Sequence, residues 1–208
     1  AAYGEVRTQR RGGAGEGGVA LVAPVVDNRG RILASEGEVA IAAADGFSVD
    51  LEGDGLLGMV VGAEEARSLA LVNEGTIRAE GGAVRLTSAQ ADAVRESVVS
   101  LGGIVEATGI SEEDGAIVIT GGGTARVSGR IAARRGEAGG EISLNAARIG
   151  LAQGAEIDAS APAGGGRVEI GPRSAPMPPK RIVASAGSRV AADATGDGDA
   201  GRIDFWSS

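Results

Sequence analysis

Carboxylates are the side chains best able to do chemistry in this chain of 208 residues, because it contains no cysteine and no histidine. Two adjacent pairs, Glu64–Glu65 and Glu112–Glu113, could in principle supply the acid and base of a glycosidase. Adjacent residues in a strand point to opposite faces, however, and in loops they are usually solvated. The lack of histidine removes the commonest general base and the Ser–His and Cys–His pairs. We therefore predict no catalytic residue and no enzyme activity.

Two acidic turns resemble parts of calcium sites. The segment DLEGDG at residues 50–55 imitates the first half of a calcium loop, but Val61 stands where the bidentate Glu should be. The second turn carries Asp193, Asp197 and Asp199, and solvated carboxylates are the usual content of such turns. We predict no metal site, while the sequence leaves calcium binding at these turns open.

One glycine motif imitates a nucleotide-binding loop. The sequence GDGLLG at Gly53–Gly58 follows a plausible strand, Phe47–Leu51, and Glu74 lies about 20 residues further on, as a dinucleotide fold would require. The flanking sequence shows no alternation of strands and helices, and Gly13–Gly18 matches the same motif without a preceding strand. A glycine turn in an inserted hairpin is the better interpretation, so we predict no cofactor.

The charge of the chain excludes some partners. The net charge of −8 argues against nucleic acid, which calls for a basic face. Three basic pairs, Arg10–Arg11, Arg134–Arg135 and Lys180–Arg181, could contact anionic glycans, although solvated surface charge is the default for such pairs.

No apolar run approaches the roughly 20 residues of a transmembrane helix. The N-terminal segment AAYGEVRTQRRGG lacks an apolar signal core.

The elements that would position such residues are short strands that recur along the chain. Each contains two apolar residues separated by one residue, the period of a strand with one buried side. One series begins at Val19, Val39, Val84, Ile117, Ile142, Val168 and Ile203, and the other begins at Ile32, Ile77, Val105, Ile131, Ile157 and Val190. The two series alternate. In the GGEISLNAARIGLAQGAEIDAS segment a third apolar run, Ile149-x-Leu151, lies between them.

The spacing of the strands predicts the architecture. Ile117 and Ile142 are 25 residues apart, and Val105 and Ile131 are 26 apart, whereas a propeller blade needs about 40–45. Glycine is frequent, at 37 residues, and aromatics make up only 2 % of the chain, which suits stacked aliphatic rows. We predict an all-β, single-stranded parallel β-helix (a solenoid) of seven or eight coils, forming a rod roughly 35–40 Å long.

Longer steps between strands predict insertions. We expect a flexible or partly ordered segment at 1–18 and the β-helix at 19–208, with insertions at 45–65, 87–97 and 171–181. The second insertion begins TSAQADAV, which predicts a capped short helix near residues 88–97. The third is proline-rich, which predicts an outward loop. The chain stops within a coil, so we expect the natural protein to continue, and open coil ends could support self-association.

Several stretches resemble the filamentous haemagglutinin family, the exoproteins of two-partner secretion in Gram-negative bacteria. They extend from about Gly17 to the end of the chain, and their order and spacing carry the resemblance. The stretches are GGVALVAPVVDNRGRILASEGEVAIAAAD, DLEGDGLLGMVV, LVNEGTIRAEGGAVRLTSAQADAVRESVVSLGGIVEATG, GGEISLNAARIGLAQGAEIDASAPAGGGRVEIG and AGRIDFWSS. The N-P-N-type motifs of the family's secretion domain are absent, so no secretion or receptor residue can be carried over to this chain.

The resemblance implies a right-handed β-helix that is secreted through an outer-membrane barrel partner and serves as an adhesin. We expect a secreted or cell-surface segment that acts as a stiff stalk and displays binding loops to a host glycan or receptor. Two alternatives stay open. A purely structural spacer or assembly subunit would show a smooth rod without a pocket. A polysaccharide-active β-helical enzyme would show a groove with carboxylates less than about 10 Å apart.

Overall fold

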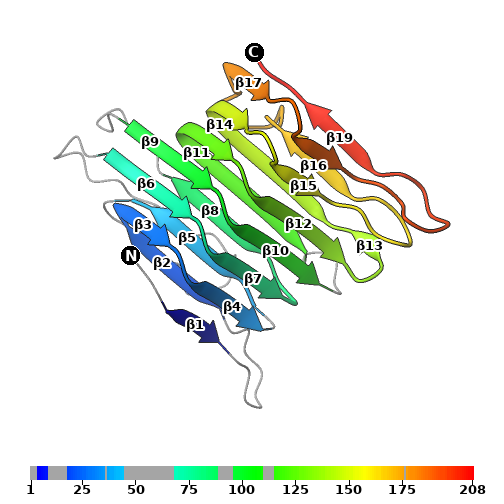
Figure 1. Cartoon of the computed structure of the whole chain (residues 1–208), viewed down its shortest axis with the longest axis horizontal. Coiled ribbons are helices and arrows are strands. Elements are labelled where there is room, and N and C mark those ends of the chain that lie inside the picture. Colours follow the sequence, from blue (N-terminus) through cyan, green and yellow to red (C-terminus); the bar gives the residue numbers. More distant parts are fainter. Residues whose placement is uncertain are drawn as a thin grey trace.

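The computed structural model describes residues 4–8, 18–35, 37–44, 68–88, 96–109, 115–175 and 177–208. Every regular element in this part of the chain is a β-strand, and the strands lie side by side from β1 at one end to β19 at the other (Figure 1). The long ladders are all parallel, and the short strand β13 (Ala138–Gly139) makes the one antiparallel pair described. The predicted all-β class and the parallel pairing are confirmed.

The strands fall into three columns, in which each strand pairs with its counterpart from the neighbouring repeat. Column 1 contains β2 (Val19–Ala23), β5 (Val39–Ala43), β8 (Val84–Ser88), β16 (Arg167–Ile170) and β19 (Arg202–Phe205), together with residues 116–121 of β11 (Ala116–Val127) and 141–146 of β14 (Glu141–Leu151). Column 2 contains β3 (Val25–Asn28), β6 (Ser68–Asn73), β9 (Glu96–Leu101) and β17 (Arg181–Ala184), together with residues 124–127 of β11 and 148–151 of β14. Column 3 contains β1 (Glu5–Thr8), β4 (Arg31–Ser35), β7 (Thr76–Glu80), β10 (Ile104–Gly109), β12 (Arg130–Arg135), β15 (Glu156–Asp158) and β18 (Arg189–Ala191).

Both predicted series of aliphatic pairs are aligned residue for residue. In column 1, Ile117 lies opposite Val84 on one side and Ile142 on the other. In column 3, Ile131 lies between Val105 and Ile157 in the same way. The insertions therefore change the length of a connection without changing the register of the strands on either side.

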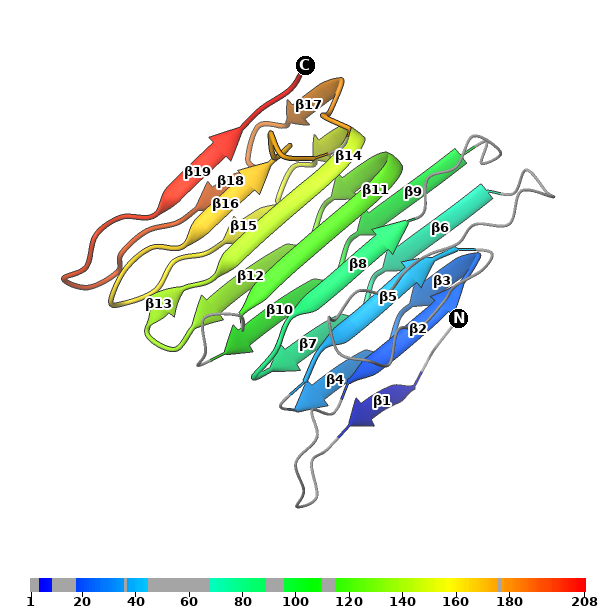
Figure 2. The same ribbon diagram turned by 180° about the vertical axis from the view of Figure 1, so that it is seen from behind.

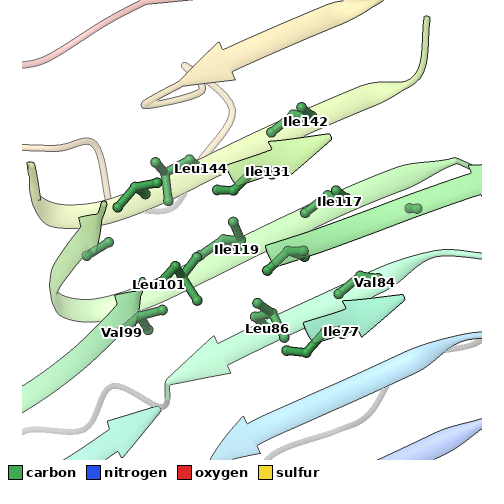
Figure 3. Packing of buried hydrophobic residues seen from close by; sticks show 14 of the residues in the cluster. Ile77, Val84, Leu86, Val99, Leu101, Ile117, Ile119, Ile131, Ile142 and Leu144 are labelled. Carbon is green, nitrogen blue, oxygen red and sulfur yellow. The ribbon is translucent and has the colours of Figure 1, made fainter. Parts of the chain in front are cut away.

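The aligned side chains form one continuous core. Residues from all three columns meet between the strands (Figure 3), among them Leu86, Leu101 and Ile131, each at most 1 % exposed. A one-residue slip would turn every such side chain outward, so burial fixes the register. At the C-terminal end the rows become exposed: Phe205 is 49 % exposed because nothing in the structure pairs beyond β19.

Glycines allow the connections between columns to pass close to one another. A Cβ on Gly103 would lie 2.0 Å from the carbonyl oxygen of Gly75, and one on Gly129 would lie 2.0 Å from that of Gly103. Stacked turns approach so closely that no side chain fits at this position. The glycine that directly precedes β4, β7, β10 and β12 is therefore a packing requirement.

Three predictions about individual segments need correction or restriction. The predicted helix near 88–97 has strand at both ends, because Ser88 ends β8 and Glu96 begins β9. Residues 89–95 and the insertion at 45–65 lie outside the described residues. Strand β1 lies inside the N-terminal segment 1–18, and Val6 pairs with Ile32, so the parallel pairing begins before Val19.

The proline-rich segment at 171–181 leads from column 1 to column 2. Its backbone is tied to β14, since Asn145 Nδ2 donates to the carbonyl of Met177 at 3.2 Å and Lys180 N donates to the carbonyl of Ala147 at 2.9 Å. The chain then enters β17, which pairs with the second half of β14. The predicted β-rich repeat thus has a third strand position that the sequence analysis identified only at Ile149–Leu151.

Candidate functional site: an arginine groove on column 2

The candidate site lies on the outer side of column 2, where β11, β14 and β17 run side by side (Figures 1 and 2). Alternation decides which side chains point out. In β14, Ile149 and Leu151 are buried, so Arg148 and Gly150 are directed outward. In β11 the buried residues are Ala125 and Val127, which leaves Thr124 and Arg126 on the outside.

The strand register brings these outward residues together. Arg148 lies opposite Thr124 on one neighbouring strand and Arg181 on the other. Two positions along, Gly150 lies between Arg126 and Val183. The result is a groove of about 410 Å³, whose walls and ends also include Ala152, Gln153 and Ser185. Gly150 has no side chain, which leaves space between Arg126 and Val183.

The groove contains three arginines, Arg126, Arg148 and Arg181, and is hereafter called the arginine groove. None of the three makes an ion pair with any described residue. Arg148 Nε donates a hydrogen bond to Thr124 Oγ1 at 3.2 Å. Arg148 and Arg181 lie opposite each other on adjacent strands, about 4.8 Å apart along the stack. Like charges in this arrangement repel each other. The arrangement can therefore hold an anion that bridges the two guanidinium groups.

Two arginines on column 3, Arg78 and Arg130, have a different environment. Arg78 Nη2 lies 2.6 Å from Glu106 Oε2, and Arg130 lies 2.5 Å from Glu156 and 3.0 Å from Asp158. The hydrogen bond with Glu156 raises the pKa of Arg130 despite partial burial. Burial alone would raise the pKa of Asp158, but hydrogen bonds from Ser160 and the charge of Arg130 outweigh it and hold that pKa below its usual value.

A second hollow of about 330 Å³ lies on column 1 near the C-terminal end, lined by Arg167, Glu169, Arg173, Arg202, Asp204 and Trp206 among others. Glu169 and Asp204 lie opposite each other on β16 and β19. Each carboxylate is held by an arginine of its own strand, Arg167 or Arg202. The hydrogen bond from Arg202 lowers the pKa of Asp204. Asp204 is therefore held in its ionised form, whereas a general acid has to keep its proton near neutral pH.

The residues singled out in the sequence are mostly not brought together. Arg134 lies on the outer side of β12 in column 3, and Lys180 precedes β17, whose first residue, Arg181, enters the arginine groove. Among the described residues, no group of three or more carboxylates is placed to hold a metal ion. The predicted acidic turn with Asp193, Asp197 and Asp199 therefore does not form such a group. The following segments lie outside the described residues: Arg10–Arg11, Gly53–Gly58, residues 50–55, Val61, Glu64–Glu65 and Glu112–Glu113. No helix in the described part of the chain is long and apolar enough to cross a membrane.

Sequence reasoning missed Arg126 and Arg148 because neither has a basic neighbour in the sequence. The sequence feature that could have revealed them is the third set of strands, those of column 2. Aligning Ala125, Ile149 and Ile182 as inward residues places the preceding residues Thr124, Arg148 and Arg181 in one outward row. Comparisons with known proteins add no assignment: no family model matches the chain, and neither a curated protein nor a solved structure is significantly similar to it.

Proposed function

We propose that the chain is a single-stranded right-handed parallel β-helix that acts as a rigid stalk of a secreted or surface-exposed adhesin. The observation that carries the proposal is the unbroken parallel register of column 1, which runs from Val19 to Phe205 in seven strand positions. Each repeat buries its aliphatic row on the next, so neighbouring repeats support one another along the stack. Such a stack transmits position and orientation over its whole length.

The outside of the stalk supplies the binding function in this proposal. The arginine groove is recessed and rich in hydrogen-bond donors, and the insertions are further display sites, notably 45–65 and 171–181. A purely structural spacer has no need of a groove with three arginines that make no ion pair with the described residues, since facing like charges weaken the fold. The groove therefore favours the adhesin over the spacer.

The proposed partners follow from the family resemblance and from this surface. An outer-membrane barrel would export the chain of a Gram-negative bacterium, and a host or surface glycan or receptor would bind the displayed surface. Folding of each repeat on the preceding one outside the membrane would favour forward movement through the barrel. Self-association through the ends of the stack is a further role that the exposed Ile203 and Phe205 could serve.

The experiment that tests this function has two readouts. Beads coated with the purified chain are applied to epithelial monolayers under flow, and the same chain is applied to an array of glycans and matrix proteins. An adhesin retains beads above the level of an albumin coat and binds a subset of array spots. A spacer does neither, and that result would overturn the proposal.

The enzyme alternative is separated by a third measurement on the same sample. A polysaccharide-active enzyme releases new reducing ends from array-positive glycans over time, and Glu169→Gln or Asp204→Asn abolishes that release. The carboxylate pair in the second hollow motivates this control. Binding without any release of reducing ends supports the adhesin, and sustained release replaces it with the enzyme.

A further inference from the structure

The arginine groove points to a specific class of ligand. We propose that it binds a linear polysaccharide carrying a carboxylate on successive sugar residues, such as a polyuronate. The inference rests on the proposed function, since it names the ligand of one displayed surface. Three observations carry it: the unpaired charges, the missing side chain at Gly150 and the chemistry of the lining residues.

The groove gathers positive charge in an acidic protein. The chain carries a net charge of −8, and several arginines elsewhere pair with a carboxylate, as Arg85 does with Glu38 at 2.5 Å. Arg148 and Arg181 instead face each other with no described carboxylate between them. A bound anion would relieve this repulsion, and carboxylates match the guanidinium fork in a bidentate manner.

Gly150 keeps the groove open without being needed for the fold. A Cβ built on Gly150 meets no atom within 4 Å, and its backbone is not in the left-handed region. Glycine also weakens a strand interior. Neither packing nor backbone conformation therefore explains this residue, whereas an occupant of the groove would.

The extent of the groove suits a polymeric ligand. Its lining residues come from β11, β14 and β17, so the groove spans three neighbouring strands of the stack. Outward residues repeat across the strands about every 4.8 Å. One carboxylate of the polymer can therefore bridge the facing guanidinium groups of Arg148 and Arg181, while its neighbouring sugar residues lie along the rest of the groove.

The lining favours a glycan over the other polyanions. Thr124, Gln153 and Ser185 offer hydroxyl and amide groups to sugar hydroxyls. The groove has no aromatic residue, whereas binding of single-stranded nucleic acid depends on aromatic stacking. An acidic peptide would satisfy the charges but would leave most of these neutral donors and acceptors unused.

The test measures binding of the full 208-residue chain to polygalacturonate fragments by titration calorimetry at low salt. Fully methyl-esterified fragments, heparin and polyglutamate are the comparison ligands. The variants are Arg148→Glu, Arg181→Glu and Gly150→Leu. The matched control is Arg134→Glu, which changes the net charge equally on an exposed position of column 3. Circular dichroism and thermal unfolding verify that each variant is folded.

The expected result is binding of polygalacturonate that esterification abolishes. Each charge reversal in the groove should weaken it roughly ten- to a hundredfold, the loss expected for a charge-assisted contact. Gly150→Leu should weaken binding similarly while leaving every charge in place, and Arg134→Glu should change it less than about threefold.

Several results would overturn this inference. Equal or tighter binding of heparin would overturn the carboxylate ligand, and equal binding of polyglutamate would overturn the glycan. Equal effects of Arg134→Glu and Arg148→Glu would place the interaction in the net charge of the protein rather than in the groove. Failure of polygalacturonate to bind leaves the adhesin proposal standing if beads are still retained on cells, because another surface would then be responsible.

Discussion

The inward and outward rows of these strands use repetition in different ways. Inside, the same class of residue recurs at each level, as in the row formed by Val84, Ile117 and Ile142. Repetition there is favourable because each aliphatic side chain packs on its neighbours and excludes water. Outside, repetition of a charged residue is unfavourable, because like charges come to lie on adjacent strands.

The outside therefore divides into two regions. On column 3, Arg78 and Arg130 are compensated by ion pairs, Arg130 lying between Glu156 and Asp158. In the arginine groove on column 2 the arginines make no ion pair with any described residue. The strand register brings outward residues of neighbouring repeats together in both regions. The types of these residues decide whether the row stabilises the stack through ion pairs or leaves charges available to a ligand.

The largest effect is expected from a polar substitution in an inward row. Ile142 is 0 % exposed, so Ile142→Asn should lower the free energy of unfolding by about 3–5 kcal/mol, through lost burial and an unsatisfied amide. Ile104 is 39 % exposed on the outer side of β10, and Ile104→Asn should cost less than about 1 kcal/mol. Urea unfolding followed by circular dichroism measures both. Equal losses would mean that the two sides of the strands are not distinct.

A smaller effect is expected at the glycine turns. In Gly103→Ala the new methyl group would meet the carbonyl of Gly75 at 2.0 Å, and the required shift of backbone should cost about 1–3 kcal/mol. Gly150→Ala places its methyl group in open space and should change stability by less than about 0.5 kcal/mol. Thermal unfolding distinguishes the two. A stable Gly103→Ala variant would show that the turns can separate without loss of pairing.

A still smaller effect concerns the compensated charges of column 3. The pKa of Asp158 is lowered in the folded protein, so its stabilising contribution is present above the unfolded pKa, near 4, and is lost as the pH falls through the folded value. Asp158→Asn should therefore cost up to about 1 kcal/mol at pH 7, and the difference from wild type should shrink as the pH falls below 4. Urea unfolding between pH 7 and pH 2.5 checks this.

The control for that series is Asp197→Asn in the exposed acidic turn. Asp197 makes no ion pair with any described residue, so removing its charge should leave stability at pH 7 unchanged within error. A loss at Asp158→Asn that stayed constant from pH 7 to pH 2.5 would point to a steric or hydrogen-bonding cause instead of the charge.

How much the sequence could predict depends on which row is considered. The alternating pairs beginning at Ile117 and Ile131 identified two strand series, because a buried row needs an aliphatic residue at every level. Column 2 was harder, since its inward positions include the buried Asn28 and Asn73, which bond to each other at 2.7 Å. Polar residues at inward positions hide a strand from any search for aliphatic alternation.

The arginine groove was beyond the reach of local patterns for a related reason. Arg126, Arg148 and Arg181 come from three different repeats and meet only when the register of column 2 is known. The pairs that stood out in the sequence, such as Arg134–Arg135, are adjacent in the chain, and adjacent residues in a strand project to opposite sides. Surface chemistry in such a stack depends on residues one repeat apart.

The smallest effect, and the one that separates the two charged regions most directly, has opposite signs on columns 2 and 3. Arg181→Thr removes one of two facing cations and should raise the free energy of unfolding by a few tenths of a kcal/mol, whereas Arg130→Thr removes a compensated cation and should lower it. Arg181→Lys keeps the charge and should give no gain. The gain at Arg181→Thr should fall as salt is raised from 10 mM to 500 mM, because both guanidinium groups are exposed to solvent and screened. Loss of stability in both threonine variants would mean that packing of the arginine side-chain stem outweighs charge repulsion. The facing arginines of the groove would then not destabilise the fold.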